Sequence, residues 1–355
     1  MKARKRTARK DHESAIVIAE FKAPTMEDVA RAAGVSPATV SRCINRPEMV
    51  REDRRLRIRA AIAELGYVPH GAARALASKR SMTIGALFPR LNSLLFGSFI
   101  APLQRRLHAE GYTLVVSSSD YDSATEQQQV SSLVSNGIDG LVLIGTSHDP
   151  EVFRLLERKA IPFVLTWSWD RNHPQPQIGF DNASAAAAVA SYLLDIGHRR
   201  IGMISGPAEG NDRVAARIHG VRAALAARGC ELKDRNLVES PFDIREGGKA
   251  FGRLMRQPDP PSAVLCGSDI FAVGALFEAR RLGLSVPEEV SVTGFDDTDL
   301  ASCVVPALTT LRTPRTEMAE RTARYLLGRL AGRATGSQQL ETELIVRESS
   351  APPAG

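Results

Sequence analysis

The sequence lacks the features of a membrane protein, a metal-binding protein or a disulfide-rich protein. No stretch of its 355 residues approaches the ~20 consecutive apolar residues that cross a bilayer. The apolar piece at residues 15–19 is too short for the core of a secretory signal. Four scattered cysteines form no CxxC pair: Cys43, Cys230, Cys266 and Cys303. We therefore expect a cytoplasmic protein without a membrane partner, a metal site or a disulfide framework.

The sequence also lacks the short motifs of the common enzyme classes. It contains no GxGxxG, GxxxxGK[ST], GxSxG or HExxH segment, and its seven histidines are dispersed. One of them, His198, stands in Gly-His-Arg-Arg-Ile, a context typical of a structural turn residue before a strand. We expect no catalytic residues and no cofactor. The alternative that stays open is a cytoplasmic sugar-processing enzyme, or a sugar-binding protein, with an accessory helical head.

Basic charge is concentrated at the start of the chain. Residues 1–80 carry 18 Lys and Arg against 9 Asp and Glu, whereas the other 275 residues carry 28 against 31. Such asymmetry is expected when one end of a protein meets a polyanion. For residues 2–10 a disordered basic tail explains the charge equally well. Between Arg42 and Arg59, however, the charges are interleaved with apolar residues at helical spacing, which favours a folded segment that binds nucleic acid.

The first folded segment carries the signals of two short helices joined by a tight turn. Thr25 can cap a helix whose first turn is acidic, and Gly34 ends it. Ser36 can cap a second helix over residues 37–44, with Pro37 in the first position, where a missing N–H costs little. This pattern predicts a helix-turn-helix. A third helix is expected over residues 51–65 and closes the core by burying Leu56, Ile58, Ile62 and Leu65.

From residue 83 onward, short apolar runs alternate with amphipathic stretches. The apolar runs predict strands at residues 84–88, 113–117, 140–144, 163–166, 200–204, 263–266 and 290–293. The amphipathic stretches predict helices at residues 99–109, 126–136, 183–195, 214–228 and 272–281. Alternation of this kind predicts Rossmann-like α/β lobes built on parallel sheets. The predicted strands and helices are too many for a single sheet and its covering helices. We therefore expect two lobes with a ligand cleft between them.

Two segments of the head are distinctive: TMEDVARAAGVSPATVSR at residues 25–42 and AELGYVP at residues 63–69. On these residues the chain resembles the lac-repressor (LacI/GalR) family, and the resemblance continues to about residue 347. It implies an all-α helix-turn-helix head joined to an α/β two-lobed domain like that of periplasmic binding proteins. It also implies an allosteric, sequence-specific DNA-binding regulator of carbohydrate metabolism, which is a repressor by family default.

The resemblance divides the chain into five expected regions. These are a basic disordered tail at residues 1–24, the helix-turn-helix domain at 25–69, a hinge helix and linker at 70–82, the two-lobed effector-binding and dimerisation domain at 83–347, and a flexible C-terminal tail at 348–355. No leucine heptads follow the last region of resemblance, so we expect a homodimer on a near-palindromic operator and not a tetramer.

The same resemblance implies which residues meet double-stranded operator DNA. Base-reading positions on the second helix match Pro37, Ala38 and Arg42, of which the arginine has the fork of donors that suits guanine. Residues placed to bond phosphates are Thr25, Ser36, Thr39, Ser41 and Asn45. In the hinge, Leu76 matches the residue that wedges into the minor groove, and Ala73 matches the close-packing position.

Effector contacts implied by the family fall at Phe96, Trp167, Phe180, Arg213, Arg217, Phe242, Ser268 and Asp296. Arg213 and Arg217 are four residues apart, hence on one helix face, and two guanidiniums at a cleft suit a carboxylate or phosphate. Several segments also resemble the gluconate-regulator branch, so we expect a sugar acid such as gluconate. The open alternative is a neutral sugar, with Arg213 paired to a structural acid such as Asp212 or Glu209.

Overall fold

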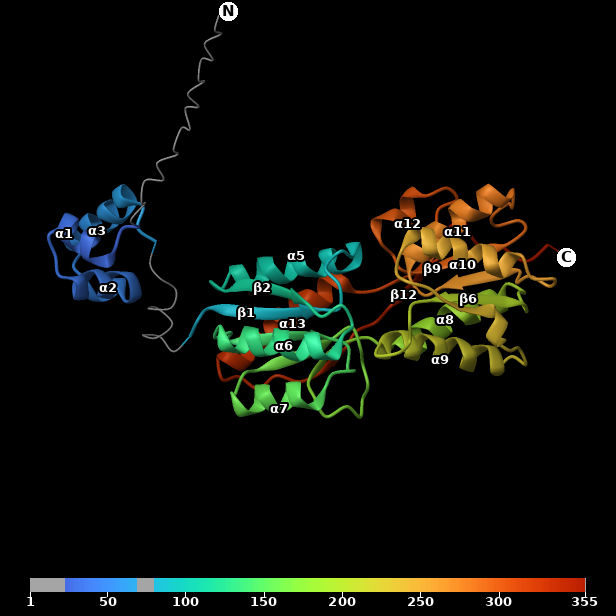
Figure 1. The fold of residues 1–355 in the computed structure, drawn as a ribbon, viewed down its shortest axis with the longest axis horizontal. Coiled ribbons are helices and arrows are strands. Elements are labelled where there is room, and N and C mark those ends of the chain that lie inside the picture. Colours follow the sequence, from blue (N-terminus) through green and yellow to red (C-terminus); the bar gives the residue numbers. More distant parts are fainter. Residues whose placement is uncertain (1–22, 69–79, 355) are drawn as a thin grey trace, which may run out of the picture. The chain divides into compact units, whose positions relative to one another are not determined.

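In a computed structural model the chain forms two compact units, one up to Lys79 and one from Arg80 onward. The structure describes residues 23–68 and 80–354 (Figure 1). The expected basic tail, up to Lys22, lies outside the described residues, as do Ala73 and Leu76 of the expected hinge. Each unit has its own hydrophobic core.

The head contains the three predicted helices, α1 (Met26–Ala33), α2 (Pro37–Asn45) and α3 (Glu52–Leu65), with a short 3₁₀ turn at Pro47–Met49. Thr25 and Asp28 form a reciprocal capping box at the start of α1, which satisfies backbone N–H groups that the helix itself leaves unpaired. Gly34 ends α1 with φ +63°, a left-handed conformation that suits glycine. The local signals in the sequence therefore produce the helices they predict.

The third helix buries fewer of its apolar residues than predicted. Ile58 is fully buried and Ile62 packs against the core, but Leu56 is 58% exposed. Two residues before Ile58 lie about 200° around the helix, so Leu56 is directed away from the core. Leu65, at the last position of α3, is 36% exposed. The prediction that these two leucines fill the core was wrong.

The second unit consists of two lobes, each with a six-stranded sheet, and the seven predicted strands are present. The first sheet has the order β11-β5-β4-β3-β1-β2, and the second β12-β10-β9-β8-β6-β7. The first contains β1 (Thr83–Phe88), β2 (Thr113–Ser118), β3 (Gly140–Ile144), β4 (Phe163–Thr166), β5 (Gln177–Gly179) and β11 (Gln338–Gln339). The second contains β6 (Ile201–Ser205), β7 (Leu237–Glu239), β8 (Ala263–Cys266), β9 (Ser291–Asp296), β10 (Thr309–Arg312) and β12 (Glu343–Ile345). All pairings are parallel except β10 with β12.

Helices cover both faces of each sheet, as expected for parallel strands. In the first lobe α5 (Leu94–His108) and α13 (Arg315–Leu330) lie on one face, and α6 (Ser123–Ser135) and α7 (Pro150–Arg158) on the other (Figure 1). In the second lobe α8 (Asn182–Asp195) packs with α9 (Asp212–Ala226), and α10 (Ile244–Met255) with α11 (Asp269–Leu282) and the short α12 (Asp299–Cys303). Because α13 returns to the first lobe, the chain passes between the lobes more than once.

Both ends of the second unit differ from the predicted boundaries. Ser81 and Met82, assigned to the linker, donate their backbone N–H groups to the Asp139 carboxylate and so belong to the first lobe. The predicted flexible tail is also partly wrong, since Ser349 is fully buried and Ser350 is 9% exposed. Backbone and side chain of Ser349 bond to β9 and β10, so residues 349–351 form part of the second lobe.

Among the helices that the structure describes, none combines the length and apolar character needed to cross a membrane. Histidine, cysteine and carboxylate side chains in the described ranges form no group able to hold a metal ion.

Candidate DNA-binding surface and ligand cavity

The second helix of the head presents the predicted DNA-reading side chains. Pro37, Ala38 and Arg42 are all exposed, while Val40 and Cys43 face the core. The guanidinium of Arg42 makes no hydrogen bond or ion pair with any residue that the structure describes, so its donors are available to a base edge. Helix α2 is therefore folded and oriented within the head as a recognition helix requires.

The predicted phosphate-binding residues lie at helix caps or along α2 and already make local bonds. The Ser36 hydroxyl accepts from the Thr39 N–H at 3.3 Å and lies 2.9 Å from the Thr39 hydroxyl. Asn45 donates to the Ser41 carbonyl at 3.0 Å. The Thr25 hydroxyl bonds to Asp28 at 2.7 Å. All five of these side chains are at least partly exposed and therefore accessible to a phosphate: Thr25, Ser36, Thr39, Ser41 and Asn45.

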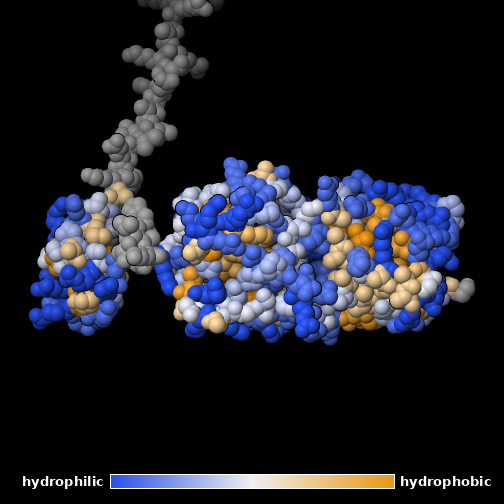
Figure 2. Space-filling model, turned by 90° about the horizontal axis from the view of Figure 1, so that it is seen from below, coloured by the Kyte–Doolittle hydropathy of each residue, from blue (hydrophilic) through white to orange (hydrophobic). Residues whose placement is uncertain are grey.

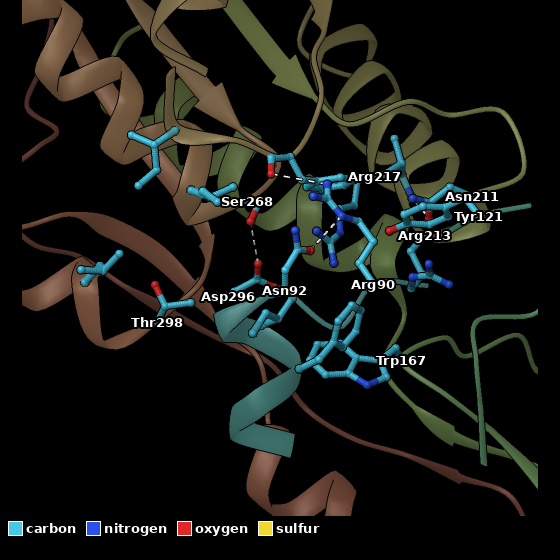
Figure 3. Close-up of a pocket in the computed structure, with 18 residues that line it drawn as sticks. Arg90, Asn92, Tyr121, Trp167, Asn211, Arg213, Arg217, Ser268, Asp296 and Thr298 are labelled. Carbon is cyan, nitrogen blue, oxygen red and sulfur yellow. Dashed lines mark hydrogen bonds between the residues drawn. The ribbon is translucent and has the colours of Figure 1, made fainter. Parts of the chain in front are cut away.

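A cavity of about 110 Å³ lies between the two lobes of the second unit (Figure 3). It is lined from the first lobe by Arg90, Asn92, Ser93, Leu95, Phe96, Tyr121 and Trp167. From the second lobe it is lined by Asn211, Arg213, Val214, Arg217, Phe242, Ile244, Ser268, Ile270, Asp296, Thr298 and Leu300. Most of these residues lie in the loops, or in the first turns of the helices, that come after strands, because the carboxyl ends of both parallel sheets meet there.

Seven of the eight predicted effector residues line this cavity, and Phe180 does not. Its side chain is fully buried and lies 6.4 Å from the ring of Phe295, centroid to centroid. Phe180 follows β5 and its ring fills the core instead of facing the opening. We therefore withdraw the expected contact between Phe180 and the ligand.

Aromatic side chains form the apolar wall of the cavity. The Trp167 ring packs edge-on against Phe96, with ring centroids 5.3 Å apart. Across the opening, Tyr121 of the first lobe is nearly parallel to Phe242 of the second, 6.4 Å away. Rings in this arrangement present flat apolar surfaces, which suit the apolar face of a sugar or another ring.

Arg217 lies at the floor of the cavity and is held by neutral groups. Its Nε donates to the Asn182 side chain at 2.9 Å, and its Nη1 donates to the Gly267 carbonyl at 2.6 Å. The guanidinium carbon lies 3.7 Å from the centroid of the Phe295 ring, a cation–π distance. Burial lowers the pKa of Arg217 to about 10, and the nearby Asp296 carboxylate opposes that shift. The group stays charged at neutral pH.

Asp296 is the acceptor of the cavity. Its Oδ2 accepts from the Ser268 hydroxyl at 3.0 Å, whereas its buried Oδ1 has no hydrogen-bond partner in the described part of the chain. Burial raises the pKa of Asp296, and it raises the pKa of neighbouring Asp269 as well. A buried oxygen without a partner is costly, so a hydroxyl of a ligand that donates to Oδ1 would remove that cost.

Arg213 lines the cavity, and one of its guanidinium nitrogens is already bonded within the protein. Its Nη1 pairs with Asp212 at 3.0 Å and donates to the Ile144 carbonyl at 3.1 Å. Asp212 in turn accepts from Thr146 and Ser168 of the first lobe. Arg213 and Arg217 share a helix face as predicted. The pairing of Arg213 with Asp212 corresponds to the alternative stated above, in which Arg213 is paired to a structural acid.

Several lining residues were not predicted, including Arg90, Asn92, Tyr121, Asn211 and Thr298. Each lies in a loop that leads from the carboxyl end of a strand toward the next helix, which is the one signal that could have found them. Four longer helices, α5, α9, α10 and α11, also begin at the cavity, since residues of their first turns or caps line it. Their N-terminal ends carry partial positive charge.

A helix-turn-helix head followed by two α/β lobes around a small-molecule cavity defines a DNA-binding transcription regulator and not an enzyme. The family model described as bacterial regulatory proteins, lacI family, matches residues 25–70, and the model of periplasmic binding protein-like domains matches residues 190–350. The chain belongs to the LacI family of bacterial transcription regulators.

Known proteins match almost the whole chain. The transcriptional repressor CytR of Escherichia coli K12 is 33% identical over 330 residues, which are 92% of this chain and 96% of CytR. The transcriptional regulator GntR of Pseudomonas aeruginosa is 35% identical over 331 residues, with the same coverage of 92% and 96%. The lac repressor dimer bound to operator and the anti-inducer ONPF is 27% identical, with a TM-score of 0.83 over 93% of this chain and 100% of that one.

Proposed function

We propose that this protein is a cytoplasmic transcriptional repressor whose affinity for operator DNA is set by a small hydroxylated ligand in the interlobe cavity. The ligand class is a sugar or a sugar acid such as gluconate. One observation supports the ligand part of this proposal. The buried Oδ1 of Asp296 has no hydrogen-bond partner among the described residues, and it lies in a cavity lined by Trp167 and Phe242. An acceptor beside flat apolar rings is the pattern that binds a hydroxylated ring.

Calorimetric titration tests this half of the proposal. We expect gluconate or one of the neutral hexoses to bind the full-length protein, and Asp296→Asn to weaken that binding. Asp234→Asn is a matched control, because the Asp234 side chain is 97% exposed and lies outside the cavity. If no sugar or sugar acid binds at millimolar concentration, the ligand class is wrong.

The DNA half of the proposal rests on α2. We propose that Arg42 reads a guanine, that Pro37 and Ala38 make apolar contacts, and that the hydroxyls and amide named above hold the phosphates. Once operators are selected from random duplexes, Arg42→Ala should lower affinity by about 1–3 kcal/mol and relax preference at one base pair. Arg31→Ala, on α1, serves as control and should leave sequence preference unchanged. An unaltered preference in Arg42→Ala would overturn the assignment.

Coupling between ligand and DNA follows from the two-lobed design. We propose a homodimer in which ligand binding changes the arrangement of the lobes and thereby the hinge segments, including Ala73 and Leu76, that meet the minor groove. A coupling free energy of about 1–3 kcal/mol is typical of such systems. Sedimentation should show a dimer at micromolar concentration, and a tetramer would contradict the proposal. The ligand should change the affinity for operator DNA by some factor, and operator DNA should change the affinity for the ligand by the same factor. Binding measurements with and without the other partner test this.

A further inference from the structure

Three guanidinium groups line the interlobe cavity, and two of them already have a carboxylate nearby. Arg213 forms an ion pair with Asp212 at 3.0 Å. Arg217 interacts electrostatically with Asp296, and each shifts the other's pKa toward its charged form. The third group, Arg90, forms no ion pair with any carboxylate in the described residues. Of these three guanidiniums, Arg90 is therefore the one without a carboxylate partner among the residues that the structure describes.

The Arg90 side chain is held in place by neutral acceptors. Its Nε donates to the Asn92 side chain at 3.2 Å, and its Nη1 lies 3.5 Å from the Phe242 carbonyl of the second lobe. Figure 3 shows Arg90 among the lining residues, beside Asn92. Arg90 is partly buried, so its charge is screened less than that of a surface arginine. These bonds orient the guanidinium while leaving donors on its terminal nitrogens.

The backbone adds to the positive potential at the same place. Helix α5 begins just after Asn92 and Ser93, whereas the first N–H groups of α10, which begins at Ile244, already bond to the Asp243 carboxylate. The Ser93 side chain makes no capping bond, so the first N–H groups of α5 are not satisfied by that hydroxyl. The N-terminus of α5 and the Arg90 guanidinium together favour an anion.

We infer that the ligand carries an anionic group, a carboxylate or a phosphate, and that Arg90 binds it. This inference rests on the proposed function, because it concerns the ligand of the same cavity. The anionic group lies at the Arg90 end, where the guanidinium can donate two parallel hydrogen bonds to it. The hydroxylated part of the ligand lies toward Asp296, whose Oδ1 accepts. Arg90, and not the pair of arginines on α9, sets the preference for acids over neutral compounds.

Fluorescence of the full-length protein tests the inference without knowledge of the natural ligand. Trp167 lines the cavity and is one of only two tryptophans, so the signal reports on this region. Inorganic phosphate is titrated at constant ionic strength into the wild type, Arg90→Gln and Arg90→Lys. We expect a saturable change in the wild type, at least about tenfold weaker binding in Arg90→Gln, and a smaller loss in Arg90→Lys.

A matched control is Arg106→Gln, since Arg106 lies on α5 outside the cavity and pairs with Glu110. This variant should bind phosphate like the wild type. Thermal unfolding checks that all three variants remain folded. No saturable change in the wild type, or an unchanged affinity in a folded Arg90→Gln variant, would overturn the inference.

Pairs of ligands that differ in one group separate this inference from the proposed function. Gluconate is compared with sorbitol, and glucuronate with glucose, by calorimetry on the wild type and Arg90→Gln. We expect the acids to bind more tightly, and the difference to vanish in Arg90→Gln. If neutral sugars bind and Arg90→Gln has no effect, the inference fails while the proposed function stands. If phosphate binding depends on Arg90 but no sugar or sugar acid binds, the sugar class fails and the anion site stands.

Discussion

At the residue scale, His198 joins distant parts of the second lobe. Its Nδ1 lies 2.9 Å from the Ser262 hydroxyl, and its Nε2 lies 3.1 Å from the Ser291 hydroxyl and 2.9 Å from the Ala351 carbonyl. The side chain is 1% exposed. Burial lowers the pKa of His198 from its ordinary value of 6.5, while the Ala351 carbonyl opposes the shift. The neutral imidazole is therefore the form that the folded lobe stabilises.

The stabilising effect of His198 should depend on pH. A folded-state pKa below the unfolded value means that the unfolded chain binds more protons, so stability is lost as pH falls below about 6.5. We expect His198→Ala to lower the free energy of unfolding by about 1–3 kcal/mol at about pH 8, and by less at about pH 5.5. Denaturant unfolding at both pH values measures this.

His219→Ala provides the comparison, since His219 is exposed on the outer side of α9. It should leave the free energy of unfolding nearly unchanged at both pH values. A destabilisation by His198→Ala that is equally large at low pH would show that lost packing, and not the neutral state of the ring, explains the effect.

The residue scale also shows what sequence reasoning could and could not identify. His198 was correctly expected to be structural, but its partners Ser262, Ser291 and Ala351 lie 64 to 153 residues further along the chain and could not be read from its local context. Arg90 was missed because nothing within a few residues of it indicates that Phe242, far along the chain, lies beside it. Arg213 was identified as a cavity residue, but its pairing with Asp212 was only one of two alternatives.

At the element scale, the C-terminal segment at residues 349–351 is attached to the second lobe by hydrogen bonds. The Val292 N–H donates to the Ser349 carbonyl at 2.8 Å, and the Ser349 hydroxyl donates to the Val292 carbonyl at 2.6 Å. The Ser350 hydroxyl lies 2.8 Å from that of Thr309 and 2.9 Å from that of Tyr192. The segment thus satisfies buried polar groups on β9, β10 and α8.

Deleting residues 348–355 should therefore destabilise the second unit. Buried polar groups left without partners cost about 1–3 kcal/mol each, so we expect a loss of at least about 2 kcal/mol in the free energy of unfolding. Calorimetric thermal unfolding measures the change. Deleting only Ala354 and Gly355 is the control, and it should be neutral because Ala354 is exposed. Equal stability of both truncated proteins would mean that the segment is only loosely attached.

Prediction of elements succeeded where the signal is local. The seven predicted strands are runs of four or five mostly apolar residues, and each strand is present with its ends shifted by no more than three residues. The elements that were not predicted include the short strands β5, β7, β11 and β12, of which the last three lie at sheet edges, and the helices α7, α10 and α13. A strand of two or three residues at a sheet edge is held by its neighbour's backbone, so its own side chains carry little pattern.

At the scale of the whole molecule, Asp212 connects the two lobes beside the cavity. Its carboxylate, at the start of α9 in the second lobe, accepts from the Thr146 backbone at 3.0 Å, the Thr146 hydroxyl at 2.9 Å and the Ser168 hydroxyl at 2.5 Å. Burial opposes ionisation, yet Arg213, Ser168 and Thr146 together hold the pKa of Asp212 below its ordinary value. The charged carboxylate therefore stabilises the observed arrangement of the lobes.

Asp212→Ala should loosen that arrangement. We expect the free energy of lobe opening to fall by about 1–3 kcal/mol, because the groups on Thr146 and Ser168 lose their acceptor. The Thr146 amide should then exchange hydrogen faster, and small-angle scattering should show a larger radius of gyration. Asp195→Ala, which removes an exposed ion pair with Arg228 on the second lobe, is the control. Unchanged exchange at Thr146 in Asp212→Ala would refute a role for this contact in holding the lobes.

Features that arise between near neighbours in the chain can be predicted from the sequence alone. Helix caps such as Thr25 and Ser36, the glycine turn at Gly34 and the apolar runs of the strands act over a few residues, so their outcome can be read locally. The concentration of basic charge in the first 80 residues is likewise independent of folding.

Which polar groups have a partner, and which are left for a ligand, depends on contacts between distant parts of the chain. Arg213 meets Ile144, 69 residues away, and Asp296 meets Ser268, 28 residues away. Whether a buried charge is compensated depends on such distant contacts, since burial and electrostatic pairing are properties of the space around a group and not of its neighbours in the chain. For this reason the free acceptor on Asp296, and Arg90 as the guanidinium without a carboxylate partner among the described residues, became visible only once the two lobes were in place.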